Sequence, residues 1–208
     1  MPANEASAQV LAGAIARLGV AQLGWSNAQS QIRTRMAFMR GNEGEVWPDV
    51  SDAALESCVT EWLQPHLIGR MSLAAIDAGC LGEALARLLT WELKRRLDEQ
   101  APTHFEAPTG SRVPVAYEAE GGPRIAIRVQ ELFGLKTHPS LAHGRVPLVL
   151  ELLSPGHKPI QVTRDLPGFW QGSWAAVKSE MKGRYPRHPW PDDPSLALPT
   201  TRAKPRGT

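Results

Sequence analysis

The sequence predicts an α+β protein, with a helical N-terminal half, a small and mostly antiparallel sheet, a further helix and a proline-rich basic tail. Three observations support this prediction. Apolar residues recur at helical spacing through the first hundred residues. After Ala101-Pro102 the apolar period shortens to two, and prolines and glycines become frequent. At 208 residues, 42% of them hydrophobic, the chain is long enough to bury a substantial core.

The first two helices are predicted over residues 6–18 and 27–40. The second begins with a capping-box pattern from Ser26 to Gln29, and Gly41 is expected to end it. Its apolar stripe is formed by Ala28, Ile32, Met36 and Met39, while Arg33, Arg35 and Arg40 lie mostly off that stripe. The second helix is therefore expected to bury one face and to expose its arginines.

Two more helical stretches follow before the change in character. Ser51 begins a helix that Pro65 ends. Residues 80–100 carry regularly spaced leucines, and Thr90 could cap a second segment within them. We therefore expect a bend or break near Trp91.

The second half carries strand patterns. Residues 113–117 form a strand candidate that Pro114 restricts to an edge or a bulge. Ile125, Ile127 and Val129 alternate with polar or small residues, residues 146–153 form an apolar run, and residues 159–163 form a short strand. A last helix is predicted from about 173 to 182, with Gly183 after it.

These patterns predict three regions: a helical subdomain over 1–100, a small β-rich subdomain with a C-terminal helix over 101–191, and a flexible basic tail over 192–208. The N-terminus has no basic stretch before its apolar part, and no apolar run reaches 18 residues, so neither a signal peptide nor a membrane span is expected. Cys58 and Cys80 fit core thiols in a reducing cytoplasm.

The charge is unevenly distributed. Residues 1–100 hold nine basic and twelve acidic side chains, whereas residues 101–208 hold fourteen and nine. A modestly basic second half is compatible with a polyanionic partner.

The phosphate- and dinucleotide-binding patterns GxxxxGK[ST] and GxGxxG are absent from the sequence, as are HExxH, GxSxG and CxxC. We therefore expect no ATP hydrolysis, no cofactor and no metal in this chain, and an independent enzyme is disfavoured. His188, Asp192 and Asp193 could form a metal or proton-transfer site. The prolines around them favour a solvated turn instead. The histidines at 104, 138, 143 and 157 are scattered and are interpreted as surface or hydrogen-bonding residues.

An aromatic and basic segment over 165–190 is the most informative part. Its large rings are Phe169, Trp170, Trp174, Tyr185 and Trp190, and its cations include Lys178, Lys182, Arg184 and Arg187. In one interpretation the rings anchor the helix and the tail to the sheet. In the other, the segment grips a nucleic acid. Both hold if the rings point inward and the four cations point outward.

The sequence resembles the C-terminal region of the HrpB family of bacterial DEAH-box ATP-dependent helicases. The matching stretches are long and cover nearly the whole chain from about residue 10. They include LGWSNAQSQIRTRMAFMR, WPDVSDAALESCVTEWLQPHL, WELKRRLDEQAPTH, PTHFEAPTGSRVPVAYE, IRVQELFGL, GRVPLVLELLSP, PIQVTRDLPGFWQGSWAAVKSEMKGRYPRHPWPDDP and PTTRAKPR. Members of this family carry motor domains that would lie before residue 1.

The resemblance implies an accessory C-terminal domain that supports nucleic-acid engagement or stabilises the helicase core, in cis or in trans. ATP and Mg²⁺ are implied only for the full-length family, whose binding residues have no counterpart here, and no catalytic residue is carried over. The implied partners are the core and single-stranded RNA or DNA, in the cytoplasm. The alternative is a protein-interaction module that makes no nucleic-acid contact.

Overall fold

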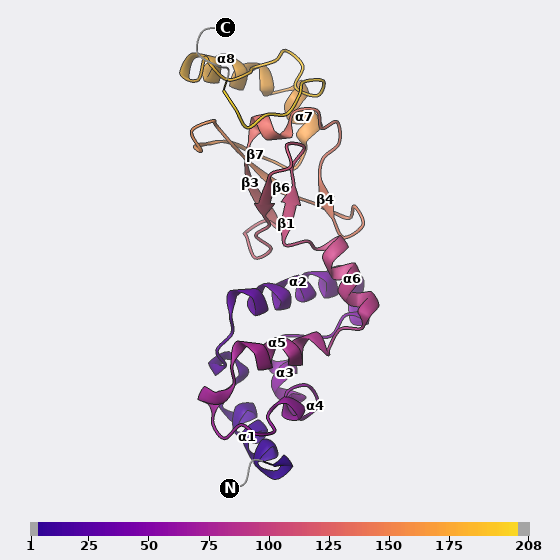
Figure 1. Cartoon of the computed structure of the whole chain (residues 1–208). Coiled ribbons are helices and arrows are strands. Elements are labelled where there is room, and N and C mark those ends of the chain that lie inside the picture. The colour runs from indigo at the N-terminus through magenta and orange to yellow at the C-terminus, as the bar shows by residue number, and fades with distance from the viewer. Residues whose placement is uncertain (1–3, 204–208) are drawn as a thin grey trace. The chain divides into compact units, whose positions relative to one another are not determined.

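Helices occupy the first hundred residues and strands appear only after them (Figure 1). The structure is a computed structural model that describes residues 4–203. It divides into two compact units at the Ala101–Pro102 junction, where the sequence changes character. The predicted α+β class is confirmed.

Unit 1 is built from six α-helices in its described part, joined by short 3₁₀ turns. The helices are α1 (Glu5–Leu18), α2 (Asn27–Glu43), α3 (Asp52–Ser57), α4 (Val59–Trp62), α5 (Ala78–Ala86) and α6 (Trp91–Gln100), and the turns are η1 (Val20–Gln22), η2 (Gly44–Val46), η3 (Gln64–His66) and η4 (Leu73–Ala75). The core contains fully buried side chains from α1, α2, α3, α5 and the segments between helices, among them Ile15, Met36, Met39, Trp47, Leu55, Leu63, Leu67, Leu81 and Leu85.

Helix α2 begins as the sequence predicts and ends later. The capping box is formed, since Ser26 accepts from the amide of Gln29 and the Gln29 side chain accepts from the amide of Ser26. The helix continues through Gly41 to Glu43. Gly44 ends it with φ of 79°, and its N–H donates to the carbonyl of Arg40. The expected stop at Gly41 is therefore wrong, because Gly44 adopts the left-handed conformation instead.

The arginines of α2 do not all face solvent. The side chain of Arg35 is only 5% exposed, and its guanidinium donates to the carbonyls of Ala101 and Leu97 and pairs with Asp98 Oδ1 at 2.8 Å. Both carbonyls lie at the C-terminal end of α6, where Leu97 O also accepts from the Ala101 N–H at 3.0 Å and the Ala101 carbonyl lies beyond the last helical residue. Arg35 therefore caps α6 from another helix.

Two further predictions about helix boundaries can be compared with the structure. Ser51 caps α3 as predicted, but the chain turns at Cys58, so two short helices replace a single one. Thr90 caps α6 by accepting from the amide of Leu93, which confirms the predicted break near Trp91.

Unit 2 contains seven short strands in its described part. They are β1 (His104–Glu106), β2 (Arg112–Pro114), β3 (Arg124–Arg128), β4 (Ser140–Leu141), β5 (Val146–Pro147), β6 (Val149–Leu153) and β7 (Pro159–Thr163), with the turn η5 (Val129–Leu132) after β3. The pairs β1–β2, β4–β5 and β6–β7 are antiparallel, and β3 pairs with β6 in parallel. The mostly antiparallel expectation holds, with one parallel pair in the sheet β3-β6-β7.

The apolar run over residues 146–153 is not one strand. β5 pairs with β4, β6 pairs with β3 and β7, and the amide of Leu148 between them donates to Pro139. The alternation at Ile125 and Ile127 buries both side chains as predicted, whereas Val129 lies in η5 rather than in the strand.

Two helices follow the sheet: α7 (Leu166–Gln171), which the sequence pattern did not indicate, and α8 (Trp174–Arg184). Gly183 lies inside α8, so the expected stop there is wrong. Residues 192–203 return to the body of unit 2, where Gly134 N–H donates to Pro194 at 2.9 Å and Thr200 N–H donates to Gln130 at 3.1 Å. This stretch belongs to the region expected to be a flexible basic tail, and the rest of that region, 204–208, lies outside the described residues.

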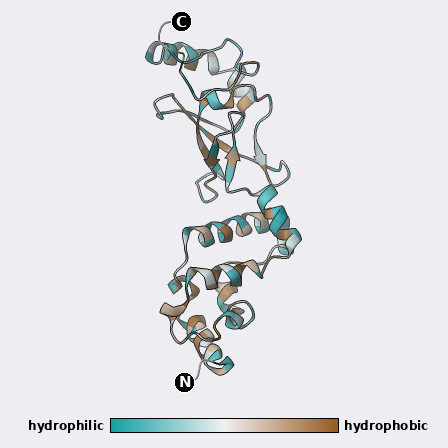
Figure 2. Cartoon of the chain, viewed as in Figure 1, coloured by the Kyte–Doolittle hydropathy of each residue, from teal (hydrophilic) through white to brown (hydrophobic). Residues whose placement is uncertain are grey.

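Colouring by hydropathy shows hydrophobic and hydrophilic residues mixed along most elements (Figure 2), and the buried residues of β3 and β6 are all hydrophobic. Helix α6 is an exception, since it is coloured as largely hydrophilic. Among the described residues no helix combines the length and apolar character needed to cross a membrane.

Candidate nucleic-acid interface

The aromatic rings of α7 and α8 point into unit 2. Asp165 caps α7 by accepting from the amide of Gly168. The rings of Phe169, Trp170 and Trp174 are buried, and Trp174 lies edge-on to Phe133 with their centroids 5.6 Å apart. This cluster fastens both helices to the loop that follows β3, because Phe133 comes directly after η5.

The other two aromatics of the segment hold the proline-rich stretch in place. Trp190 and Tyr185 are half-buried. The indole N–H of Trp190 donates to Tyr185 O at 2.9 Å, and the indole N–H of Trp174 donates to Pro191 O at 3.0 Å. The Tyr185 ring lies so close to Gly156 that a Cβ there would be 2.7 Å from the phenolic oxygen. Indole donors thus replace the backbone bonds that prolines cannot make.

The four candidate cations differ in what surrounds them. The ammonium group of Lys178 contacts the carboxylate of Asp192, and Arg184 pairs with Glu180 on the preceding turn of α8 at 3.1 Å. Lys182, Arg184 and Arg187 are exposed, whereas Lys178 is half-buried. The side chains come from α8 and the turn directly after it, but part of their charge is already balanced within the chain.

A shallow depression of about 250 Å³ lies at the C-terminal end of α8. Its lining residues are Arg184, Tyr185, Pro186, Arg187, His188 and Ala203, so it contains two guanidinium groups and no carboxylate. Burial lowers the pKa of His188, and the positive charges of Arg128 and Arg187 lower it further. The neutral imidazole adds a hydrogen-bonding group to a positively charged surface.

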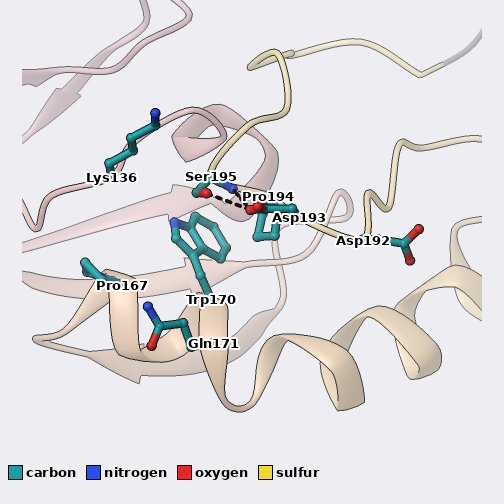
Figure 3. Close-up of a pocket in the computed structure, with 8 residues that line it drawn as sticks. All are labelled: Lys136, Pro167, Trp170, Gln171, Asp192, Asp193, Pro194 and Ser195. Carbon is teal, nitrogen blue, oxygen red and sulfur yellow. Dashed lines mark hydrogen bonds between the residues drawn. The ribbon is translucent and has the colours of Figure 1, made fainter.

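A larger cavity, of about 500 Å³, opens between α7 and residues 192–195 (Figure 3). It is lined by Lys136, Pro167, Trp170, Gln171, Asp192, Asp193, Pro194 and Ser195. The Trp170 indole is engaged, since it donates to Leu135 O at 3.0 Å, and the Asp193 carboxylate accepts from the Ser195 hydroxyl at 2.6 Å. Asp192 lies apart from the other residues drawn. The same Asp193 oxygen accepts from the Ser195 N–H at 2.9 Å, so the contact between these two lining residues is the local hydrogen bonding of a turn.

The suggested metal or proton-transfer trio does not come together as a site. Asp192 faces Lys178, Asp193 caps the turn at Ser195, and His188 lines the depression at the end of α8. Within the described range no group of three or more His, Cys, Asp or Glu side chains is positioned to hold a metal ion.

One histidine has a structural role that the sequence did not reveal. His138 Nε2 donates to Leu148 O at 2.7 Å, and Leu166 N–H donates to His138 Nδ1 at 3.1 Å. The neutral ring therefore bridges the β5–β6 junction and the start of α7. Only the tertiary arrangement brings these three residues together, and no local pattern indicates it.

Comparisons with known proteins agree on one family. The family model described as ATP-dependent helicase C-terminal, HrpB type, matches residues 62–194. The chain is 43% identical over 204 residues to the ATP-dependent RNA helicase HrpB of Escherichia coli, and the match covers 98% of this chain and 25% of that relative. The chain thus spans about a quarter of the length of that relative.

Two solved structures are similar to this chain in fold as well as in sequence. The crystal structure of the E. coli DExH-box NTPase HrpB matches with a TM-score of 0.86 and 43% identity, over 94% of this chain and 24% of that one. The crystal structure of the E. coli DEAH/RHA helicase HrpB matches with a TM-score of 0.76 and 40% identity, over 91% and 24%.

Proposed function

Because the chain belongs to the HrpB-type family of ATP-dependent helicase C-terminal regions, we propose that it is an accessory module of such a helicase and supports the engagement of nucleic acid. The module works beside the core domains, in cis or in trans. It contacts single-stranded RNA or DNA through phosphates. Its two free thiols, Cys58 and Cys80, fit a reducing cytoplasm.

The observation that carries this proposal is the depression at the end of α8, whose lining residues include two arginines and no acidic residue, while Arg184 also pairs with the exposed Glu180 outside that lining. Arg184 and Arg187 both line the depression, with Tyr185 between them in the sequence, and Lys182 lies two residues before Arg184 on α8. A guanidinium group matches a phosphate with paired N–H donors, and its charge is attracted to any phosphate whatever the base. The module therefore binds without sequence preference.

The rigidity of the region favours this use. The rings of Trp174 and Trp190 lie with their centroids 5.9 Å apart, and their indole N–H groups donate to Tyr185 O and Pro191 O, which lie before and after Arg187 in the chain. Cations on an ordered scaffold lose less conformational entropy on binding than cations on a loose tail. The aromatic residues thus position the basic ones.

ATP and Mg²⁺ belong to other domains in this proposal. The chain has no phosphate-binding loop, and its described residues bring no cluster of carboxylates together for Mg²⁺. The module contributes binding and support, while hydrolysis takes place in the core.

The test is fluorescence anisotropy with a labelled single-stranded oligonucleotide at several salt concentrations. The double variant Arg184→Ala/Arg187→Ala should lower the slope of log K against log salt by about 1.4, or roughly 0.7 for each phosphate that is no longer neutralised. The control Arg17→Ala/Arg112→Ala removes the same charge from exposed positions elsewhere and should keep most of the slope. A parent chain that fails to bind at low salt, or equal slopes in both variants, would refute the proposal.

A second candidate function, a protein-interaction module, is favoured by one observation on α1. Val10 and Leu18 lie two turns apart on this helix and are 60% and 58% exposed. An apolar stripe of this kind can pack against another domain. Substituting both residues with Ser would weaken co-elution with a helicase core and leave oligonucleotide binding unchanged.

A further inference from the structure

Trp91, the first residue of α6, is the exposed member of the seven tryptophans in the chain. It is 77% exposed, whereas four of the others are buried and two are half-buried. No other large apolar side chain of α6 is exposed with it, since Leu93 is half-buried and Leu97 is buried. The Trp91 ring is therefore exposed by itself on α6 and is not the centre of an apolar patch.

The opposite face of α6 is firmly held. Arg96 pairs with the buried Glu43 at 2.6 Å and stacks over Trp47 with its Cζ 5.6 Å from the ring centroid. Arg35 donates to carbonyls at the end of the same helix. These contacts fix how α6 is rotated about its axis, so the outward direction of Trp91 is a property of the fold.

Two cations share the outward face with Trp91. Lys94 and Arg95 follow it at spacings of three and four residues, which place all three on one side of the helix. Both are exposed, and the Arg95 guanidinium lies over the Trp91 ring, with its Cζ 5.4 Å from the centroid. Arg95 also pairs with Glu99 at 3.9 Å, an exposed pair that holds it weakly.

We propose that Trp91, Lys94 and Arg95 form a stacking site for one base of a single-stranded nucleic acid and for its adjoining phosphates. The base lies on the free face of the indole, while Arg95 covers the other face. Lys94 and Arg95 meet the backbone on either side of that base. This inference rests on the proposed function for the class of ligand, and it uses a different unit and a different contact.

The chemistry of the patch favours a nucleic acid over a protein surface. Every base has a π-face that stacks on an aromatic ring, and cations beside the ring satisfy the phosphates. Protein docking sites surround an aromatic anchor with further apolar contacts that exclude water, and here the exposed residues around it are polar, namely Thr90, Glu92, Lys94, Arg95, Asp98 and Glu99. Of the last two, Asp98 pairs with Arg35 and Glu99 with Arg95. An indole flanked by cations and open to solvent suits a base.

The test compares two labelled single strands of equal length and charge, one normal and one made of abasic residues, against the full chain at low salt. Stacking predicts that the chain binds the normal strand more tightly. Trp91→Ala should weaken binding of the normal strand by roughly 5- to 150-fold and leave the abasic strand unaffected. Trp91→Phe should retain most of the difference, because it keeps a ring. The control Met71→Ala removes another exposed apolar side chain of unit 1 and should change neither affinity.

A direct signal comes from quenching of tryptophan fluorescence by acrylamide. The most accessible fraction of the emission should disappear in Trp91→Phe, and in the parent chain the normal strand should protect it. Equal affinities of the parent for normal and abasic strands, or unchanged binding by Trp91→Ala, would overturn the stacking site. Either result would leave the α8 proposal standing, because that proposal is tested separately by the salt slope of Arg184→Ala/Arg187→Ala. If instead that double variant binds normally while Trp91→Ala does not, the stacking site stands and the α8 site fails.

Discussion

The ammonium group of Lys178 lies against the carboxylate of Asp192, fourteen residues further along the chain. The hydrogen bond and positive charge of Lys178 lower the pKa of Asp192, and Lys182 adds a smaller effect. Of the four cations that the sequence put forward for nucleic-acid contact, Lys178 is thus already paired inside unit 2. We therefore place the proposed phosphate contact toward the end of α8, at Arg184 and Arg187.

Releasing Lys178 should strengthen binding to a polyanion. Asp192→Asn removes the carboxylate and leaves a full positive charge near the surface, so the salt slope should steepen by up to about 0.7. Anisotropy titrations at several salt concentrations measure this. Glu45→Gln makes the same change in net charge on an exposed residue of unit 1 and is the matched control. Equal slopes for the two variants would show that Lys178 does not reach the ligand.

Removing the chain from Asp165 onward should unfold unit 2 and spare unit 1. Phe133 would lose the rings of Trp170 and Trp174 that now lie 6.0 and 5.6 Å from it, centroid to centroid. The milder Trp174→Ala should cost about 3–5 kcal/mol, as large buried aromatics do. Thermal unfolding followed by circular dichroism is the measurement. A soluble monomer of residues 1–164 with an unchanged melting temperature would contradict the expected role of these rings.

The bridge made by His138 should make stability depend on pH. Burial lowers the pKa of this imidazole, and the hydrogen bond to Leu148 O and the charge of Asp165 only partly oppose that shift. Protonation would also remove the Nδ1 lone pair that accepts from Leu166 N–H. The unfolded chain binds the proton more tightly, so the contribution is complete above pH about 6.5 and is lost as the pH falls toward the folded pKa.

His138→Gln should therefore be less stable than the parent at pH 7.5, and the two free energies of unfolding should converge at acidic pH. His157→Asn is the control. This residue is exposed with φ of 59°, a conformation that Asn tolerates, so the gap to the parent should stay constant with pH. Urea denaturation at each pH gives the free energies. A constant gap for His138→Gln would show that its protonation is not linked to folding.

Two glycines of unit 2 should respond to Ala in opposite directions. A Cβ at Gly156 would meet the Tyr185 hydroxyl, so Gly156→Ala should destabilise by about 1–3 kcal/mol. Gly183 lies inside α8 with open space around it, so Gly183→Ala should stabilise by about 0.5–1 kcal/mol. Chemical denaturation measures both. If the Tyr185 hydroxyl is responsible, Gly156→Ala/Tyr185→Phe should recover part of the loss, and no recovery would assign the cost to another cause.

Local chemistry explains which elements the sequence could predict. The caps at Ser26, Ser51 and Thr90 depend on residues three positions away, and all three were found. The strand β7 was predicted with its observed bounds, because Pro159 marks its start and the alternation is short and clear. Choosing between Gly41 and Gly44 as a helix end was not possible, since both are glycines near the end of one pattern.

The side-chain contacts at the candidate sites depend instead on residues that are far apart in the sequence. Arg35 looked like a surface arginine because its carbonyl partners lie more than sixty residues away. The pairing of Lys178 with Asp192 and the exposure of Trp91 also follow from how elements pack. The exposure of Trp91 could have been predicted from one pattern in the sequence. Leu93 and Leu97 define the inward face of α6, and position 91 falls outside that face.

Residues 194–201 hydrogen-bond to residues 128–134, and this affects the order in which the chain can fold during synthesis. Arg128 donates to Thr201 O across 73 residues, and Gln130 and Gly134 also find partners in this segment. A ribosome must therefore release nearly all of unit 2 before the surroundings of η5 can be completed. Unit 1 has its contacts within the first 101 residues and can settle earlier. A pause or a frameshift late in translation would leave one finished unit attached to one that exposes its aromatic residues.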